Sequence, residues 1–212
     1  MERALWRQGH RVVAGMDEVG RGAWAGPVSV GVAVLAGSSG RPPRGLRDSK
    51  LVPEDEREEL FGPVAAWCAA WAVGHAEAAE CDRLGMTGAL RLAARRALDA
   101  LPGGLRPDAV VLDGPFDYLS PPGDRGTPAE LDPVVRTVVD GDARCASVAA
   151  ASVLAKVTRD RIMRAVADSY PPFDFHRNKG YPSPDHRMAL RGYGLSAIHR
   201  RSWSFVGGLP WR

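Results

Sequence analysis

Residues 12–34, VVAGMDEVGRGAWAGPVSVGVAV, join two apolar runs through a short polar turn. The lengths and compositions of the runs predict buried strands over residues 11–16 and 28–35, paired as an antiparallel hairpin. The turn carries two adjacent carboxylates, Asp17 and Glu18, followed by glycines and a single arginine. Because two short strands rarely need so much charge and glycine between them, this pattern indicates that the turn binds a ligand.

The rest of the sequence alternates short apolar runs with segments of helical periodicity. These predict strands over residues 71–77, 109–112 and 134–139, and helices over residues 53–61, 86–101, 145–168 and 185–191. The alternation is typical of an α/β fold with helices flanking the sheet, and the antiparallel first hairpin makes the sheet mixed. Residues 116–133, rich in proline, glycine and aspartate, predict a surface loop. We expect one domain over residues 1–170, with a small, mostly helical or coil C-terminal region over residues 171–212 packed on it.

The composition is that of a folded protein, with 45% apolar and 25% charged residues. A net charge of +3 does not indicate a nucleic-acid partner by itself, but basic residues gather in residues 156–212, which predicts one basic face. The three cysteines lack CxxC spacing, which argues against a disulfide framework or a zinc site. Without a signal-like segment or an apolar run of about 20 residues, we expect a cytoplasmic monomer with no membrane contact.

Three predicted strands end in carboxylates: Asp17 with Glu18, then Asp113, then Asp140 or Asp142. Ligands gather at strand ends in open α/β sheets, and a set of oxygen ligands selects a hard ion such as Mg²⁺ or Mn²⁺. Two such ions about 4 Å apart are the usual apparatus for displacement at phosphorus. The alternative is local, because an acidic pair before a glycine turn and Asp-Gly after a strand are both common turn sequences.

One geometric condition applies to the first pair of acids. In a regular strand Asp17 and Glu18 would point to opposite faces of the sheet. Both reach one site only if the chain leaves β geometry there, which Gly15 and Gly20 allow.

Two further patterns favour contact with nucleic acid. Gly20, Arg21 and Gly22 would expose backbone amides to a phosphate or a sugar hydroxyl, although a tight hairpin with a surface arginine is the alternative. Arg177 and Lys179 are interleaved with aromatic residues, as on surfaces that use cations for the backbone and rings for stacking. Lys50, Lys156 and Arg159 would individually be solvated charges. 

The segment DEVGRGAWAGPV, residues 17–28, resembles the signature of type 2 ribonucleases H, and of the ribonuclease HII family in particular. Five further blocks resemble the same family in the same order: RDSK (47–50), VLDG (111–114), GDARCASVAAASVLAKVTRDRIM (141–163), NKGYPSPDH (178–186) and HRRSW (199–203). Six blocks in order, covering the chain nearly end to end, are far more specific than the first block alone.

The resemblance implies a ribonuclease H-like fold for residues 1–170 and substrate contact by residues 171–212. It implies cleavage of the RNA strand of RNA–DNA hybrids, and cleavage on the 5′ side of single ribonucleotides embedded in duplex DNA, as in replication and repair. The products would carry 3′-hydroxyl and 5′-phosphate ends. The implied cofactors are two divalent ions, Mg²⁺ or Mn²⁺, and the implied partners are the two kinds of nucleic acid.

The resemblance also assigns site residues. The four acids that bind metal and catalyse in the family fall on Asp17, Glu18, Asp113 and Asp142, which selects Asp142 over Asp140. The positions that contact substrate in the family are the ribonucleotide-binding backbone, the junction-sensing tyrosine and a lysine near phosphate, and these fall on Gly20, Arg21, Gly22, Tyr181 and Lys50.

Two other functions compete with this interpretation. One is a metal-dependent nuclease of the same fold with another substrate, such as a junction resolvase. The other is a non-catalytic nucleic-acid-binding domain. The full set of acids argues against the second, because a binding protein gains nothing from repulsive carboxylates that face phosphate.

Overall fold

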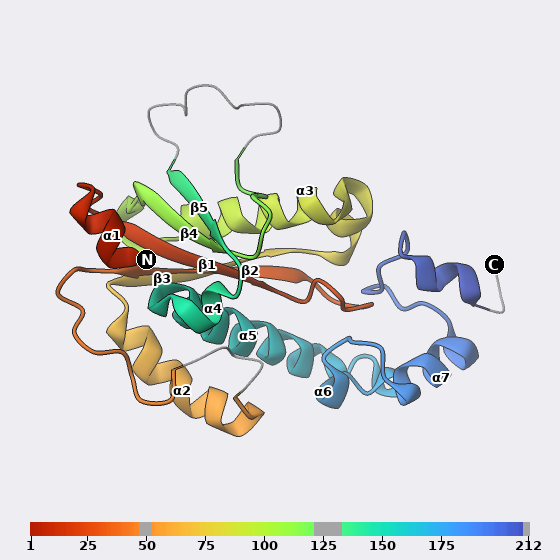
Figure 1. Ribbon diagram of the computed structural model, residues 1–212. Helices are drawn as coiled ribbons and strands as arrows, with labels where there is room; N and C mark the ends of the chain where they lie inside the picture. The colour runs from red at the N-terminus through yellow and green to blue at the C-terminus, as the bar shows by residue number, and fades with distance from the viewer. Residues whose placement is uncertain (47–51, 121–132, 210–212) are drawn as a thin grey trace.

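The computed structural model describes residues 1–46, 52–120 and 133–209, and its centre is a five-stranded sheet (Figure 1). The strands are β1 (Val13–Val19), β2 (Val28–Leu35), β3 (Ala70–Ala76), β4 (Ala109–Asp113) and β5 (Val134–Val138). They lie in the order β3-β2-β1-β4-β5. The pairs β1–β2 and β2–β3 are antiparallel, whereas β1–β4 and β4–β5 are parallel. The predicted α/β class, mixed sheet and antiparallel first hairpin are therefore confirmed.

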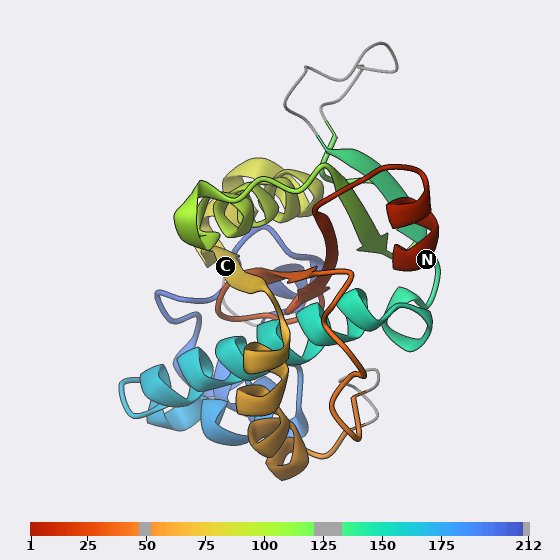
Figure 2. The same ribbon diagram turned by 90° about the vertical axis from the view of Figure 1, so that its left-hand side faces the viewer.

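Two long helices cover opposite faces of the sheet (Figures 1 and 2). On one face, α3 (Ala78–Asp99) shares a buried core with β1, in which its Ala93 contributes beside Met16. On the other face, α5 (Ala146–Ala167) approaches β1 so closely that a Cβ on Gly15 would lie 2.2 Å from the carbonyl carbon of Ser147. Because both faces are covered, β2 is buried along its whole length, and its sequence is apolar except for Ser29 instead of alternating.

Shorter elements complete the described chain. They are α1 (Glu2–Arg7), α2 (Glu54–Trp67), α4 (Gly141–Arg144), α6 (Phe175–Asn178), α7 (Pro184–Tyr193) and the 3₁₀ turns η2 (Pro102–Gly104), η3 (Pro171–Phe173) and η4 (Ser204–Gly208). Within the described ranges, every helix is too short or too polar to cross a bilayer.

The C-terminal region folds back onto the connection between β1 and β2. The Trp24 amide donates to the Gly180 carbonyl at 2.8 Å, and the Trp24 carbonyl accepts from the Arg200 amide at 2.9 Å. A separate buried cluster, which includes Ala25, Met163 and Phe175, joins this connection to α5 and α6. Two segments near the end of the chain therefore flank the polar turn near its start.

Strand β1 is longer than we predicted. It continues to Val19 instead of ending at residue 16, because Asp17 and Glu18 stay paired with Gly31 and Val30 of β2. The expectation that the carboxylates follow the strand was therefore wrong, since they lie within it.

Two helical boundaries also differ from prediction, and one helix was missed. Helix α2 runs through Pro63 because Val64 packs into the core against α5. Helix α3 begins eight residues early, since Glu77 forms a capping box with Glu80 and a kink at Gly85 joins two helical stretches. Helix α1 was not predicted at all. The part of the 116–133 segment that is described, up to Ser120 and from Pro133, contains no helix, and strand β5 follows it.

Candidate active site

Three aspartates meet at one edge of the sheet. Asp17 lies near the end of β1, Asp113 is the last residue of β4, and Asp142 lies in α4 directly after β5. Because these strands are parallel, their carboxyl ends reach the same edge. One carboxylate oxygen from each lies within 4.8 Å of the others, and Asp17 and Asp142 are buried. We call these three residues the aspartate group.

Short local contacts orient this group. The Asp17 carboxylate accepts from the Glu18 amide at 2.7 Å, and the Asp113 carboxylate accepts from the Gly141 amide at 2.8 Å. Gly141 follows the left-handed residue Asp140 (φ 54°) and precedes Asp142. Asp140 is exposed, whereas Asp142 belongs to the aspartate group. The structure therefore places Asp142, the acid that the resemblance selected, beside Asp17 and Asp113.

Glu18 lies apart from the aspartate group because β geometry continues through it. Asp17 shares the face of Gly15, which packs on α5, whereas Glu18 shares the face of Met16, which packs on α3. Glu18 nevertheless lines the same hollow, and its carboxylate lies 3.6 Å from the Arg21 guanidinium. Burial raises the pKa of nearby Tyr118, and the negative charges of Glu18, Asp17 and Asp113 raise it further.

A hollow of about 200 Å³ connects the acids to the predicted substrate contacts. It is lined by Asp17, Glu18, Val19, Gly20, Arg21, Gly22, Asp113, Ser152, Lys156 and Tyr181. The structure thus places the glycine turn (Gly20, Arg21 and Gly22) and Tyr181 beside the acids. Lys50 lies outside the described residues.

The two glycines of this turn serve different purposes. Gly20 is left-handed (φ +84°), and a Cβ there would lie 2.2 Å from Arg159 Nε, so the protein itself requires glycine. Gly22 has no left-handed backbone, and a Cβ there would meet nothing within 4 Å. A side chain at position 22 would instead occupy space on the exposed side of the turn. The absence of a side chain at Gly22 therefore leaves room for a ligand.

Tyr181 is fixed by contacts on several sides. Its hydroxyl oxygen accepts from the Gly20 amide at 3.0 Å. Its carbonyl accepts from His186 Nδ1 at 2.9 Å, and its ring centroid lies 5.3 Å from the Arg159 guanidinium carbon. The ring is therefore held against the glycine turn.

A buried pair of histidines supports Tyr181 from behind. His199 Nδ1 accepts from the Ser196 amide at 2.9 Å, so its proton lies on Nε2, which donates to His186 Nε2 at 2.8 Å. His186 then carries its own proton on Nδ1 and donates it to Tyr181. Burial, helped by His186 and Arg201, lowers the pKa of His199 to about 3. The pair is neutral at physiological pH. Its hydrogen bonds all run the same way, from His199 to His186 and from His186 to the Tyr181 carbonyl.

Several basic residues lie elsewhere than predicted. Lys156 is not solvated: it lines the hollow, and its Nζ lies 2.8 Å from Asp160 Oδ1. Arg159 is fully buried. Lys179 is 5% exposed, and its Nζ lies 3.1 Å from Oε1 of the half-exposed Glu54, so it forms an ion pair within the protein instead of a nucleic-acid surface.

Two of the aromatic residues near Lys179, Phe173 and Phe175, also belong to the core, since both are buried. A residue that sequence reasoning missed is Ser152, which lines the hollow one helical turn before Lys156. The spacing of four residues within a predicted helix could have placed the two on one face.

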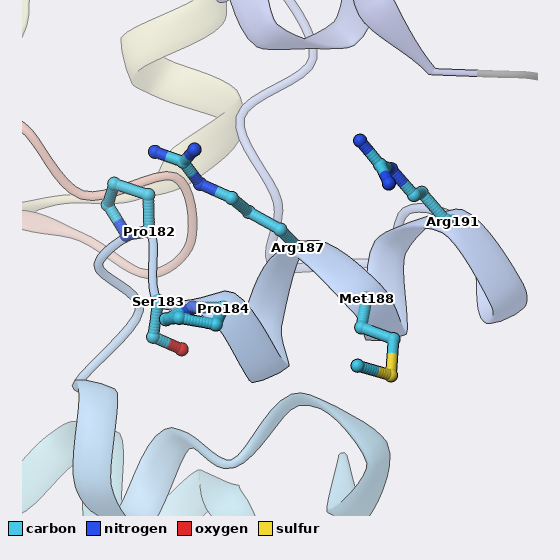
Figure 3. A pocket seen from close by; sticks show the side chains of 6 residues that line it. All are labelled: Pro182, Ser183, Pro184, Arg187, Met188 and Arg191. Atoms are coloured by element: carbon cyan, nitrogen blue, oxygen red, sulfur yellow. The ribbon is translucent and has the colours of Figure 1, made fainter.

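A second hollow, of about 530 Å³, follows Tyr181 along the chain (Figure 3). Its lining consists of Pro182, Ser183, Pro184, Arg187, Met188 and Arg191. In Figure 3 the two arginine side chains extend to the same side of α7, and Met188 extends away from them. The Arg187 guanidinium lies 5.3 Å from the ring centroid of Trp24, which follows the glycine turn. Basic side chains therefore continue along the surface next to the first hollow.

Comparison with known proteins is consistent across sequence and structure. The family model described as ribonuclease HII matches residues 14–206. Ribonuclease HII of Streptomyces avermitilis is 51% identical over 205 residues, which cover 96% of this chain and 82% of that protein. Ribonuclease HII of Thermus thermophilus is 45% identical over 217 residues, covering 100% of this chain and 95% of the relative. The crystal structure of ribonuclease H2 from Pyrococcus horikoshii superposes with a TM-score of 0.70 and 27% identity, covering 93% of this chain and 96% of that one.

Proposed function

This chain belongs to the ribonuclease HII family, whose members are endonucleases acting on RNA–DNA hybrids, and we propose that it also cleaves duplex DNA at single embedded ribonucleotides. Cleavage falls on the 5′ side of the ribonucleotide and leaves a 3′-hydroxyl and a 5′-phosphate. One observation carries the proposal: a single hollow has three of the four acids, Asp17, Glu18 and Asp113, in its lining together with the glycine turn and Tyr181.

The acids fit hard divalent ions. Their donor set consists of carboxylate oxygens, and carboxylates this close repel one another unless cations balance them. A pair of ions, Mg²⁺ or Mn²⁺, would be held by Asp17, Asp113 and Asp142, with Glu18 reaching the same hollow from the other face of β1 to complete the ligand set. The ions would supply Lewis-acid activation of water and neutralisation of the leaving 3′-oxygen. The contribution of the chain itself is orientation, because the Glu18 and Gly141 amides already fix two of the carboxylates.

Selectivity for RNA comes from the other wall of the hollow. The 2′-hydroxyl is the group by which a protein tells RNA from DNA at one nucleotide. The exposed amides of the glycine turn donate to the 2′-oxygen, and the ring of Tyr181 packs against the neighbouring sugar. A deoxynucleotide would leave these polar groups without a partner, which disfavours it strongly.

A recognition unit this small accounts for action on one ribonucleotide. One turn and one tyrosine, placed directly beside the acids, read one sugar. A single 2′-hydroxyl is then sufficient to place the adjoining phosphate at the aspartate group, so the site needs no run of RNA.

The test uses four labelled substrates: a duplex with one ribonucleotide, the same duplex in DNA only, an RNA–DNA hybrid, and a four-way DNA junction. We expect cleavage of the hybrid and of the first duplex, at the 5′ side of its ribonucleotide, with either Mg²⁺ or Mn²⁺ and not with EDTA. The hybrid controls for active enzyme. Cleavage of the hybrid without cleavage at the single ribonucleotide would refute the proposal, and preference for the junction would favour the resolvase interpretation.

A further inference from the structure

Arg200 lies directly behind the glycine turn and binds its carbonyls. The side chain is fully buried. Its Nη2 donates to the Gly20 carbonyl at 2.7 Å and its Nη1 donates to the Arg21 carbonyl at 3.1 Å. Nε and Nη2 also donate to the Gly26 carbonyl at 3.2 and 3.1 Å. One guanidinium thus binds carbonyls at both ends of the segment that joins β1 to β2.

These contacts determine where the amides of the turn point. In a trans peptide the carbonyl and the following N–H point in opposite directions. With the Gly20 and Arg21 carbonyls turned toward Arg200, the amides of Arg21 and Gly22 must point away from it, toward the exposed side of the turn. Neither amide has an acceptor among the described residues. They are the two donors that the proposed recognition of ribose requires.

A buried arginine is costly, so its presence requires an explanation. Burial lowers the pKa of Arg200 to about 10, and the group therefore stays charged at neutral pH. A hydrophobic side chain would fill the same space without the cost of desolvating a charge. A lysine would keep the charge but lacks the planar fork that reaches several carbonyls at once. The site selects a guanidinium because that group alone satisfies this set of acceptors.

We propose that Arg200 is a positioning residue for ribonucleotide selection. It fixes the peptide planes of the glycine turn so that two amides face the 2′-oxygen, and its positive charge behind the carbonyls strengthens those amides as donors. This inference rests on the proposed recognition of a single ribonucleotide. It adds that selectivity depends on a residue that does not touch the substrate.

Arg159 provides a matched control. It too is a fully buried arginine, and it donates to the carbonyls of Pro27, Ala25 and Lys179. It therefore ties the same hairpin to the C-terminal region without binding the carbonyls of Gly20 or Arg21. Replacing either arginine removes a buried guanidinium, but only the change at Arg200 frees the two peptide planes that carry the donors.

The experiment measures binding without cleavage. In the Asp113→Asn background, with Mg²⁺, fluorescence anisotropy gives Kd for a duplex with one ribonucleotide and for the same duplex in DNA only. The ratio of the two values is the selectivity. We expect Arg200→Lys to reduce this ratio about tenfold, the effect of a lost or misdirected hydrogen bond. Arg159→Lys, which keeps a cation near the Tyr181 ring and leaves the Gly20 and Arg21 carbonyls bound to Arg200, should reduce the ratio by less, even if both duplexes bind more weakly.

The outcomes separate the two proposals. If the Asp113→Asn parent shows no preference for the ribonucleotide, recognition of a single ribonucleotide fails and the role of Arg200 fails with it. If the parent shows the preference and Arg200→Lys retains it, the role of Arg200 alone is refuted. If both lysine variants lose selectivity equally, and each loss follows the drop in that variant's melting temperature, the role of Arg200 is merely structural. Arg200→Gln, which keeps one amide donor, repeats the comparison if the lysine variant is unfolded at the assay temperature.

Discussion

Asp17 and Asp113 of the aspartate group line one hollow with the glycine turn, but the fold builds the group and the turn in different ways. Strand topology brings the aspartates together, and the contacts that orient Asp17 and Asp113 come from adjacent residues or the neighbouring strand end. The glycine turn is held by side chains far away in the sequence, with Tyr181 161 positions and Arg200 180 positions from Gly20. Catalysis and selectivity should therefore respond to different mutations.

The largest effect is expected on the side of the aspartates. Asp113→Asn keeps an oxygen that can accept from Gly141, but it removes a negative charge that would hold the proposed ions. We expect activity on every substrate to fall on the order of 10²- to 10³-fold. Thermal unfolding without divalent ions should occur at no lower temperature, because a repulsive charge is gone. Wild-type turnover in this variant would contradict the assignment of the acids.

Gly22→Ala tests whether the turn can fail while the fold is intact. Because a Cβ at position 22 meets nothing within 4 Å, we expect an unchanged melting temperature. Its methyl group would displace the sugar, and a misplacement of about 1 Å costs about 10²-fold in kcat/KM. Gly37→Ala, at another position with open space, is the control and should change neither quantity.

The contrast with Gly20 sharpens this test. Gly20→Ala would place a methyl group against Arg159 and 2.8 Å from the Pro27 carbonyl, so it should lower the melting temperature as well as activity. Equal stability losses at positions 20 and 22 would show that the second glycine is structural too.

A smaller effect is expected for Tyr181→Phe, which retains the ring and removes the acceptor of the Gly20 amide. Loss of one such hydrogen bond predicts about a tenfold lower kcat/KM on the duplex with one ribonucleotide. The melting temperature should change little, because the contacts of the ring remain. Parallel losses of activity and stability would indicate that Tyr181 serves only packing.

The smallest effect at neutral pH concerns His199, which supports the turn through His186. Its pKa is about 3 in the folded protein and 6.5 ordinarily, so between these values only the unfolded chain takes up the proton. The free energy of unfolding should therefore fall as pH drops below 6.5, by at most about 1.4 kcal/mol per pH unit from this residue. Denaturant titrations at pH 7, 6 and 5 measure the slope, and His199→Asn should make it shallower. An unchanged slope would contradict the assigned neutral pair.

The sequence predicted the aspartate group, which strand topology assembles, much better than the support of the glycine turn, which comes from residues distant in the chain. Apolar runs located the five strands, and acids near their ends indicated the aspartate group. Periodicity says nothing about a contact across 145 positions, such as the Glu2 carboxylate that accepts from the Ser147 amide at the start of α5. This explains why α1 was missed.

Charge was the least informative signal. In the sequence Arg159 and Arg200 cannot be told apart from surface arginines. They are buried because they bind backbone carbonyls that come within reach only when the first hairpin packs against the C-terminal region. Likewise, Glu18 lies on the opposite face from Asp17 because β1 continues through both residues. Pairing with β2 determines how far β1 continues, and the sequence pattern did not reveal that pairing.

The separation of Gly20 and Arg200 also matters for the order of events during synthesis. The first hairpin leaves the ribosome 180 residues before the arginine that holds its turn. At about 5–20 residues per second, this delay lasts about 10 to 40 s. For most of that interval the nascent chain contains Asp17 and Glu18 but lacks Tyr181, His186, His199 and Arg200. The proposed selection of ribonucleotides would therefore be among the last properties that the growing chain acquires.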